Sequence, residues 1–174
     1  DYFDDFTKEE GALNNWSRGT YVKFQNTRNH LTAYNPGLRF EDLTEAGLSN
    51  YATHLREVKN LQNSTIIKQI KLLKWFLRWA TTKGYCQTLD YINFKPKLKT
   101  SEKKIIFLDW PELMTVYNYP FTDKQKTLER VRDVFCFCCF TSLRYSDVAN
   151  LKRSDVFDSY ISLTTIKTAD SIKI

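Results

Sequence analysis

The sequence predicts a mainly α-helical protein with a small β component confined to its C-terminal part. Apolar residues recur at helical spacing in several segments of the first 90 residues. The 174 residues include only 5 Gly and 4 Pro, which disfavours a turn-rich all-β chain. Residues 160–174 instead show a strand–turn–strand pattern that is typical of a β-hairpin.

Three helical segments are expected within the first 58 residues. Residues 2–16 form a short acidic amphipathic segment, and residues 17–34 and 45–58 follow with apolar residues near helical spacing. Ser17 and Thr44 stand at the starts of the last two segments, and both are residue types that cap helix N-termini.

The strongest helical pattern covers residues 65–83, with Asn63 or Ser64 as its cap and Gly84 at its end. One face is apolar and should face a core: Ile66, Ile70, Leu73, Leu77 and Ala80. The opposite side carries cations and an indole: Lys68, Lys71, Lys74, Trp75 and Arg78. This stripe can lie along a DNA backbone, but an ordinary solvent-exposed face would show the same pattern, so both interpretations stay open.

The composition changes at residues 91–104, where Pro, Lys and Ser replace the apolar periodicity. We expect an extended basic linker here, whose Lys95, Lys97 and Lys99 can follow phosphates. It would join a helical domain, residues 1–90, to a second unit, residues 105–174. Residues 59–104 hold 11 of the 26 basic residues but only 2 of the 20 acidic ones, although the whole chain carries +6. This concentration of charge indicates a phosphate backbone as the partner.

In the second unit we expect a short strand at residues 105–108 and a helix that starts after Asp109, with Pro111 at an early helical position. A further helix covers residues 124–141. The hairpin at the end has no further strand to pair with, which predicts a truncated domain.

The cysteines and histidines argue against a metal site. Three of the 4 cysteines lie in one apolar run and are expected to be buried, reduced thiols: Cys136, Cys138 and Cys139. There are only 2 histidines, and no pair of cysteines has zinc-finger spacing. No apolar stretch reaches the 18 residues or so that a membrane span requires.

The candidate functional residues follow the helix expected at residues 124–141. A tight Thr141-Ser142 corner leads through Leu143 to Arg144. A guanidinium at the end of a rigid helix can hold two phosphate oxygens at once. Asp147 lies about one turn further on and could orient Arg144 by a charge-assisted bond, although a purely structural Arg–Asp pair would have the same spacing.

The residues around Arg144 closely resemble the first conserved box of the tyrosine recombinases, the phage-integrase family. That box is usually written Thr-Gly-Leu-Arg-x-Ser-Glu/Asp-x-x-x-Leu-x-x-x-Asp. The matching positions are Thr141, Leu143, Arg144, Ser146, Asp147, Leu151 and Asp155, and the one departure is Ser142 in place of Gly.

Other parts of the chain fit the same family. The Lys-Thr pair at Lys167 resembles the pair near the turn of the family's β-hairpin, and residues 1–90 resemble its SAM-like core-binding domain. Residues 130–133, Arg-Val-Arg-Asp, are similar to those of relatives from Bacteroides-type mobile elements. The resemblance implies a SAM-like helical bundle followed by a truncated α+β catalytic domain.

It further implies an enzyme that cuts one DNA strand with a tyrosine, through a 3′-phosphotyrosine link and without metal or cofactor. Arg144 would stabilise the phosphate transition state, Lys167 would be the general acid, and Asp147 would support them. However, no His-x-x-Arg occurs, and no tyrosine follows the hairpin. Neither Tyr145 nor Tyr160 matches the nucleophile. We therefore expect these 174 residues alone to be inactive.

The expected partner is double-stranded DNA, and neither a membrane nor a small molecule is expected. The parent protein would be a tetramer on DNA in the bacterial cytoplasm, associated with the nucleoid, and the fragment a monomer. Two alternatives stay open: a non-catalytic helical DNA-binding regulator of a mobile element, and a helical protein–protein module whose basic stripe only faces solvent.

Overall fold

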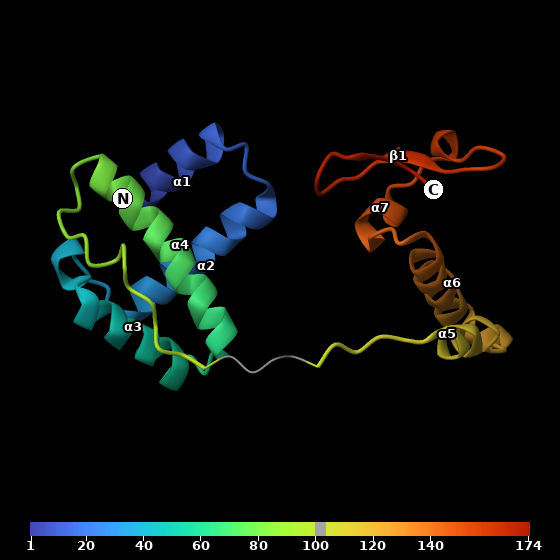
Figure 1. Ribbon diagram of the computed structural model, residues 1–174, viewed down its shortest axis with the longest axis horizontal. Helices are drawn as coiled ribbons and strands as arrows, with labels where there is room; N and C mark the ends of the chain where they lie inside the picture. Colours follow the sequence, from blue (N-terminus) through green and yellow to red (C-terminus); the bar gives the residue numbers. More distant parts are fainter. Residues whose placement is uncertain (100–103) are drawn as a thin grey trace. The chain divides into compact units, whose positions relative to one another are not determined.

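The structure is a computed structural model that describes residues 1–99 and 104–174 (Figure 1). The chain divides into two compact units, the first ending at residue 103 and the second starting at residue 104. The described part of the first unit has only helices as regular elements, and the second combines helices with one two-stranded sheet. The prediction of a mainly α protein with a small β part is confirmed.

The first unit is built around its last helix. Its elements are α1 (Tyr2–Leu13), α2 (Arg18–Tyr34), the short 3-10 helix η1 (Phe40–Asp42), α3 (Glu45–Glu57) and α4 (Asn63–Thr82). Helix α4 contacts α1, α2 and α3, and Figure 1 shows it running through the middle of this unit. The predicted inner face of α4 is confirmed, because all five of its apolar residues are buried.

The helix ends follow local chemistry. The Thr44 hydroxyl caps α3 by accepting from the Gly47 amide at 3.2 Å, as predicted. Helix α4 ends before Gly84, whose φ of +78° suits glycine. The prediction that Asn63 or Ser64 caps α4 is wrong, because the N-cap is Gln62. Asn63 is the first helical residue, and its side-chain amide donates to the Lys99 carbonyl at 2.7 Å.

An aromatic cluster joins α1 to α2 and α4. The Phe6 ring is fully buried and lies edge-on to Phe24, Phe76 and Trp79, with ring centroids 5.1, 5.5 and 5.7 Å away. Such edge-to-face pairs add to the stability gained from burial alone. Acidic α1 is thereby held against α4, which has more buried residues than any other described helix.

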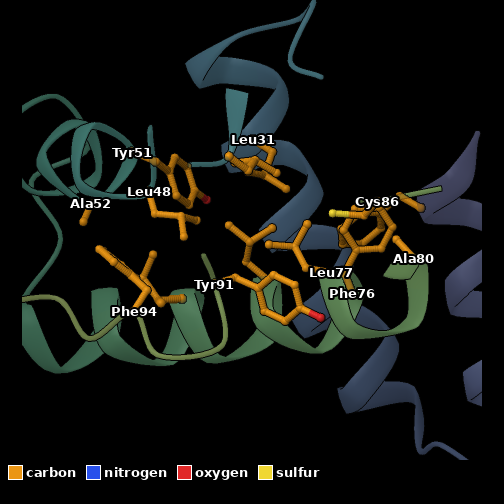
Figure 2. Close-up of a cluster of buried hydrophobic side chains, with 14 of the residues drawn as sticks. Leu31, Leu48, Tyr51, Ala52, Phe76, Leu77, Ala80, Cys86, Tyr91 and Phe94 are labelled. Carbon is orange, nitrogen blue, oxygen red and sulfur yellow. The ribbon is translucent and has the colours of Figure 1, made fainter. Parts of the chain in front are cut away.

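The segment that follows α4, residues 85–99, is here called the strap. Tyr91 and Phe94 are buried, and Figure 2 shows both in one cluster with Leu48 of α3 and Leu77 of α4. The strap is also held by polar bonds, one near its middle and one at its C-terminal end. Asp90 accepts from the Glu45 amide at 3.0 Å, and the Lys99 carbonyl accepts from α4 as described above.

The predicted linker at residues 91–104 therefore needs correction in its first part. Residues 91–99 pack on the helices of the first unit, because their alternate apolar side chains find a hydrophobic surface there. The helical unit thus extends beyond residue 90. Residues 100–103 of the predicted linker lie outside the described residues.

The second unit starts with helices and ends in a hairpin. Its elements are α5 (Trp110–Tyr117), η2 (Asp123–Gln125), α6 (Lys126–Thr141), α7 (Tyr145–Ala149), η3 (Arg153–Asp155), β1 (Ser162–Thr164) and β2 (Ser171–Lys173). Asp109 and Glu112 form a capping box at the start of α5. The two strands are antiparallel, with Leu163 opposite Ile172. The predicted helix start, the helix before Arg144 and the hairpin are confirmed.

Arg132 holds the two longer helices of this unit together. From α6, its guanidinium donates to the Tyr117 and Tyr119 carbonyls, at 2.7 and 3.1 Å, where α5 ends. It also lies over the Phe121 ring at 5.2 Å. A cation at a helix C-terminus satisfies carbonyls that have no partner within the helix.

Two predictions for this unit are wrong. Residues 105–108 form no strand, because no described residue pairs with them, and Ile106 is 90% exposed. Of the three cysteines in the apolar run only Cys136 is buried, whereas Cys138 is half-buried and Cys139 is exposed. Described apolar side chains cover only one side of α6.

A substitution at Gly47 tests how closely η1 and α3 pack. A Cβ at this position would lie 1.8 Å from the Asp42 carbonyl oxygen, which is main chain and cannot rotate away. We expect Gly47→Ala to lower the free energy of unfolding by about 1–3 kcal/mol in urea denaturation. The matched control is Gly19→Ala in α2, where a Cβ would meet only the Ser17 hydroxyl, 3.8 Å away, among described residues outside the adjacent helix backbone. Equal stability of the two variants would contradict the close approach.

Candidate functional site

The corner between α6 and α7 positions Arg144. Helix α6 ends at Thr141, and Ser142 adopts the left-handed conformation with φ 58° and ψ 15°. This conformation ends the helix, and the Leu143 side chain is buried directly after it. The Thr141 hydroxyl donates to the Phe137 carbonyl at 2.7 Å. Arg144 follows as the N-cap residue of α7 and is exposed.

The guanidinium of Arg144 enters no ion pair or hydrogen bond with the residues that the structure describes. Its backbone is extended, with φ −72° and ψ 151°, between a helix end and a helix start. An exposed arginine on a constrained backbone can bind an oxyanion through two parallel N–H donors.

Asp147 does not form the predicted bond to Arg144. Its carboxylate is buried, and Oδ1 accepts from the Ile166 amide at 2.9 Å. The other oxygen, Oδ2, is buried and has no hydrogen-bond partner among the described residues. The carboxylate therefore holds the hairpin against α7, because leaving it without the Ile166 donor would be costly.

Lys167 lies in the turn between β1 and β2 and is exposed. The buried Thr165 organises this turn: its amide donates to the Asp170 carbonyl at 2.9 Å, and its hydroxyl lies 2.8 Å from that of Thr168. Ile166, the residue that Asp147 holds, directly precedes Lys167. A single hydrogen bond thus connects the helix that starts at Arg144 to the turn that carries Lys167. Sequence reasoning missed the part played by Thr165.

The basic surface of the first unit comes from α4 and the strap. Lys68, Lys71 and Arg78 of α4 are exposed, as predicted. The strap adds three exposed lysines that alternate with buried or half-buried residues: Lys95, Lys97 and Lys99. We call these six cations the basic surface.

Two members of the predicted stripe lie differently. Trp75 is half-buried against Trp16 and Phe24, and its indole N–H donates to Glu10 at 3.0 Å. Lys74 is also half-buried, and it donates to strap carbonyls. Burial, and then the positive charges of Arg78 and Lys95, lower the pKa of Lys74. The prediction that Trp75 lies opposite the core is wrong, because α1 covers that side of α4.

The described residues contain no cluster of three or more His, Cys, Asp or Glu able to hold a metal ion. In the same part of the chain, no helix combines the length and the apolar character of a membrane span.

The left-handed residue at the corner can be tested directly. A left-handed conformation costs a non-glycine residue about 1–2 kcal/mol, which exceeds the roughly 0.5–1 kcal/mol of extra chain entropy that glycine loses on folding. We expect Ser142→Gly to raise the free energy of unfolding of the second unit by up to about 1 kcal/mol. The control Ser146→Gly, within helix α7, should lower it. Destabilisation by both substitutions would contradict the left-handed corner.

Comparison with known proteins supports the fold. No curated protein matches the chain significantly. A crystal structure of a lambda integrase dimer bound to a COC′ core site has a TM-score of 0.79 at 17% identity, covering 99% of this chain and 60% of that chain. A lambda integrase tetramer bound to a Holliday junction has a TM-score of 0.72 at 19% identity, covering 99% and 49%. The chain thus spans about half to 60% of the length of these proteins.

The family itself is shown by the first unit. The model of the phage integrase SAM-like domain matches residues 1–96, which is more than half of the chain. The match covers all four helices of the first unit and most of the strap. This 174-residue chain therefore belongs to the phage integrase SAM-like domain family.

Proposed function

We propose that this chain is the DNA-binding part, with the beginning of the catalytic domain, of a site-specific tyrosine recombinase that acts on double-stranded DNA. The observation that carries the proposal is the Asp147–Ile166 hydrogen bond. It joins the two motifs, at Arg144 and at Lys167, that the family resemblance singles out separately. The SAM-like family of the first unit and the lambda integrase fold support it.

The proposed reaction is a transfer of a phosphoryl group between two oxygens. A tyrosine oxygen attacks the phosphorus, the bond from phosphorus to the 5′-oxygen breaks, and a 3′-phosphotyrosine link forms. Arg144 donates to the non-bridging oxygens, where negative charge grows in the transition state. Lys167 gives its proton to the leaving 5′-oxygen. Asp147 acts as a positioning residue that holds the turn of Lys167 beside α7.

The rest of the machinery is proposed to lie in other parts of the parent protein. The tyrosine, the second arginine and the histidine or tryptophan have no match in this sequence. We propose that the fragment alone is a monomer without cleavage activity, and that the parent assembles as a tetramer on nucleoid DNA. A non-catalytic helical DNA-binding regulator of a mobile element is the second candidate, because the family match lies in the helical first unit, which lies outside the catalytic motifs at Arg144 and Lys167.

The basic surface is proposed to bind the phosphate backbone. Its six cations come from two segments that lie against each other, and only Asp90 and Glu102 are acidic within residues 59–104. Two residues of the predicted stripe do not belong to this surface. Trp75 packs against the core, and Lys74 donates to strap carbonyls. Phosphate contacts release counterions, so the affinity should depend steeply on salt.

Substitutions within the basic surface test its part in DNA binding. Replacing Lys68, Lys71 and Arg78 by Ala should weaken duplex binding and reduce the slope of log K against log salt by about 0.9 for each phosphate that is no longer neutralised, or about 2.7 for three. Fluorescence anisotropy at several salt concentrations measures the slope. The matched control removes the same charge elsewhere on the first unit: Lys8, Arg18 and Lys23, which are all exposed. Similar slopes for the two triple variants would reject the proposed surface.

Trapping of a covalent intermediate tests whether these 174 residues cleave DNA. A pool of nicked duplexes with a randomised centre traps covalent intermediates of tyrosine recombinases, because the short nicked strand diffuses away after cleavage. We expect no protein–DNA adduct in a denaturing gel with these 174 residues alone, since no residue matches the nucleophile. An adduct that disappears in Tyr145→Phe or Tyr160→Phe would overturn the proposed inactivity.

A further inference from the structure

Lys74 differs from the other cations on its side of α4. Its Nζ donates to the Ile92 carbonyl at 2.8 Å and to the Phe94 carbonyl at 3.2 Å, both in the strap. Lys71 and Arg78, about one turn away on either side, are exposed and make no such bond with the described residues. Lys74 therefore binds the strap backbone, whereas the neighbouring Lys71 and Arg78 face solvent.

The two bonds from Lys74 hold the strap backbone next to the segment in which apolar and lysine side chains alternate. Phe94 is buried, Leu98 is half-buried, and the three lysines between and beyond them are exposed. Side chains of an extended segment alternate between two sides, so a shift of one residue would turn these lysines toward the helices. Fixing the carbonyls of Ile92 and Phe94 fixes which side the lysines occupy.

The surroundings of Lys74 disfavour the charged form of a lysine. Lys74 is partly desolvated and lies near the positive charges of Arg78 and Lys95, and these causes lower its pKa. Two carbonyl acceptors offset part of this cost, because hydrogen bonds from a charged donor are stronger than neutral ones. The ammonium thus has partners here without any phosphate.

We propose that Lys74 is a positioning residue of the DNA-binding surface, which holds the strap in the alignment that presents Lys95, Lys97 and Lys99 to the phosphates of a duplex. The inference rests on the proposed function. It removes Lys74 from the predicted set of direct phosphate ligands and gives it an indirect part in binding.

The test compares Lys74→Met with Lys71→Met, since each removes one positive charge from the same helix face. Hydrogen exchange of the strap, measured without DNA, should rise about tenfold in Lys74→Met, which is the effect of losing hydrogen bonds from one charged group. It should stay unchanged in Lys71→Met. Duplex affinity should fall in both variants. The salt slope should be retained in Lys74→Met, because the strap lysines still reach the phosphates once the strap is ordered on the duplex, at a cost in affinity. It should be reduced by about 0.9 in Lys71→Met, which loses one phosphate contact.

A third variant loosens the strap without changing the charge. Asn63→Ala removes the bond from Asn63 to the Lys99 carbonyl at the C-terminal end of the strap. We expect lower duplex affinity with an unchanged salt slope, as in Lys74→Met. If the two strap bonds only stabilise the fold and do not contribute to DNA binding, both variants should keep the wild-type duplex affinity at temperatures where they are folded. That result would contradict the inference.

The outcomes separate this inference from the proposed function. If the wild-type chain binds duplex and Lys74→Met loses slope like Lys71→Met, with an unchanged strap, then Lys74 is a direct phosphate ligand and the inference is overturned. If the wild-type chain shows no salt-dependent duplex binding, the proposed function fails first. In that case, faster exchange in Lys74→Met would still report the bond to the strap.

Discussion

The first unit depends on the wide apolar face of α4, which is covered by three helices and by the strap. Seven of its residues are buried, from Ile66 to Ala80, and Trp75 is half-buried beside them. Because so much of the circumference is covered, little of α4 stays exposed to solvent. Lys68, Lys71 and Arg78 lie on what is left, so the location of the basic surface follows from the packing of the core.

Local patterns in the sequence were enough to predict the elements. Helical spacing, Thr44 as a cap, the Asp109 helix start and the hairpin at residues 160–174 all depend on neighbours a few residues apart, and the structure confirms them. The predictions failed where contacts between residues far apart in the sequence determine the position of a side chain or segment. Trp75 is held by Glu10, and residues 91–99 are drawn onto α3 and α4. Nothing within a few residues of either position indicates such a partner.

In the candidate site, too, local motifs were predictable and a contact between distant residues was not. Arg144 and Lys167 were found through motifs, and both are exposed in the structure. The partner of Asp147 was not foreseen, because the spacing to Arg144 suggested a bond within one helix turn, whereas the carboxylate accepts from Ile166, 19 residues away. In the first unit, Lys74 shows likewise that a charged residue on an amphipathic helix need not face solvent.

The tryptophans give the two units different optical environments. The chain has 4 tryptophans, of which Trp16, Trp75 and Trp79 belong to the packed first unit, whereas Trp110 in the second unit is 65% exposed. An indole emits at shorter wavelength when it is shielded from water. The blue side of the fluorescence spectrum therefore reports on the first unit and the red side on the second, so a single unlabelled sample can show whether the two units melt together or separately.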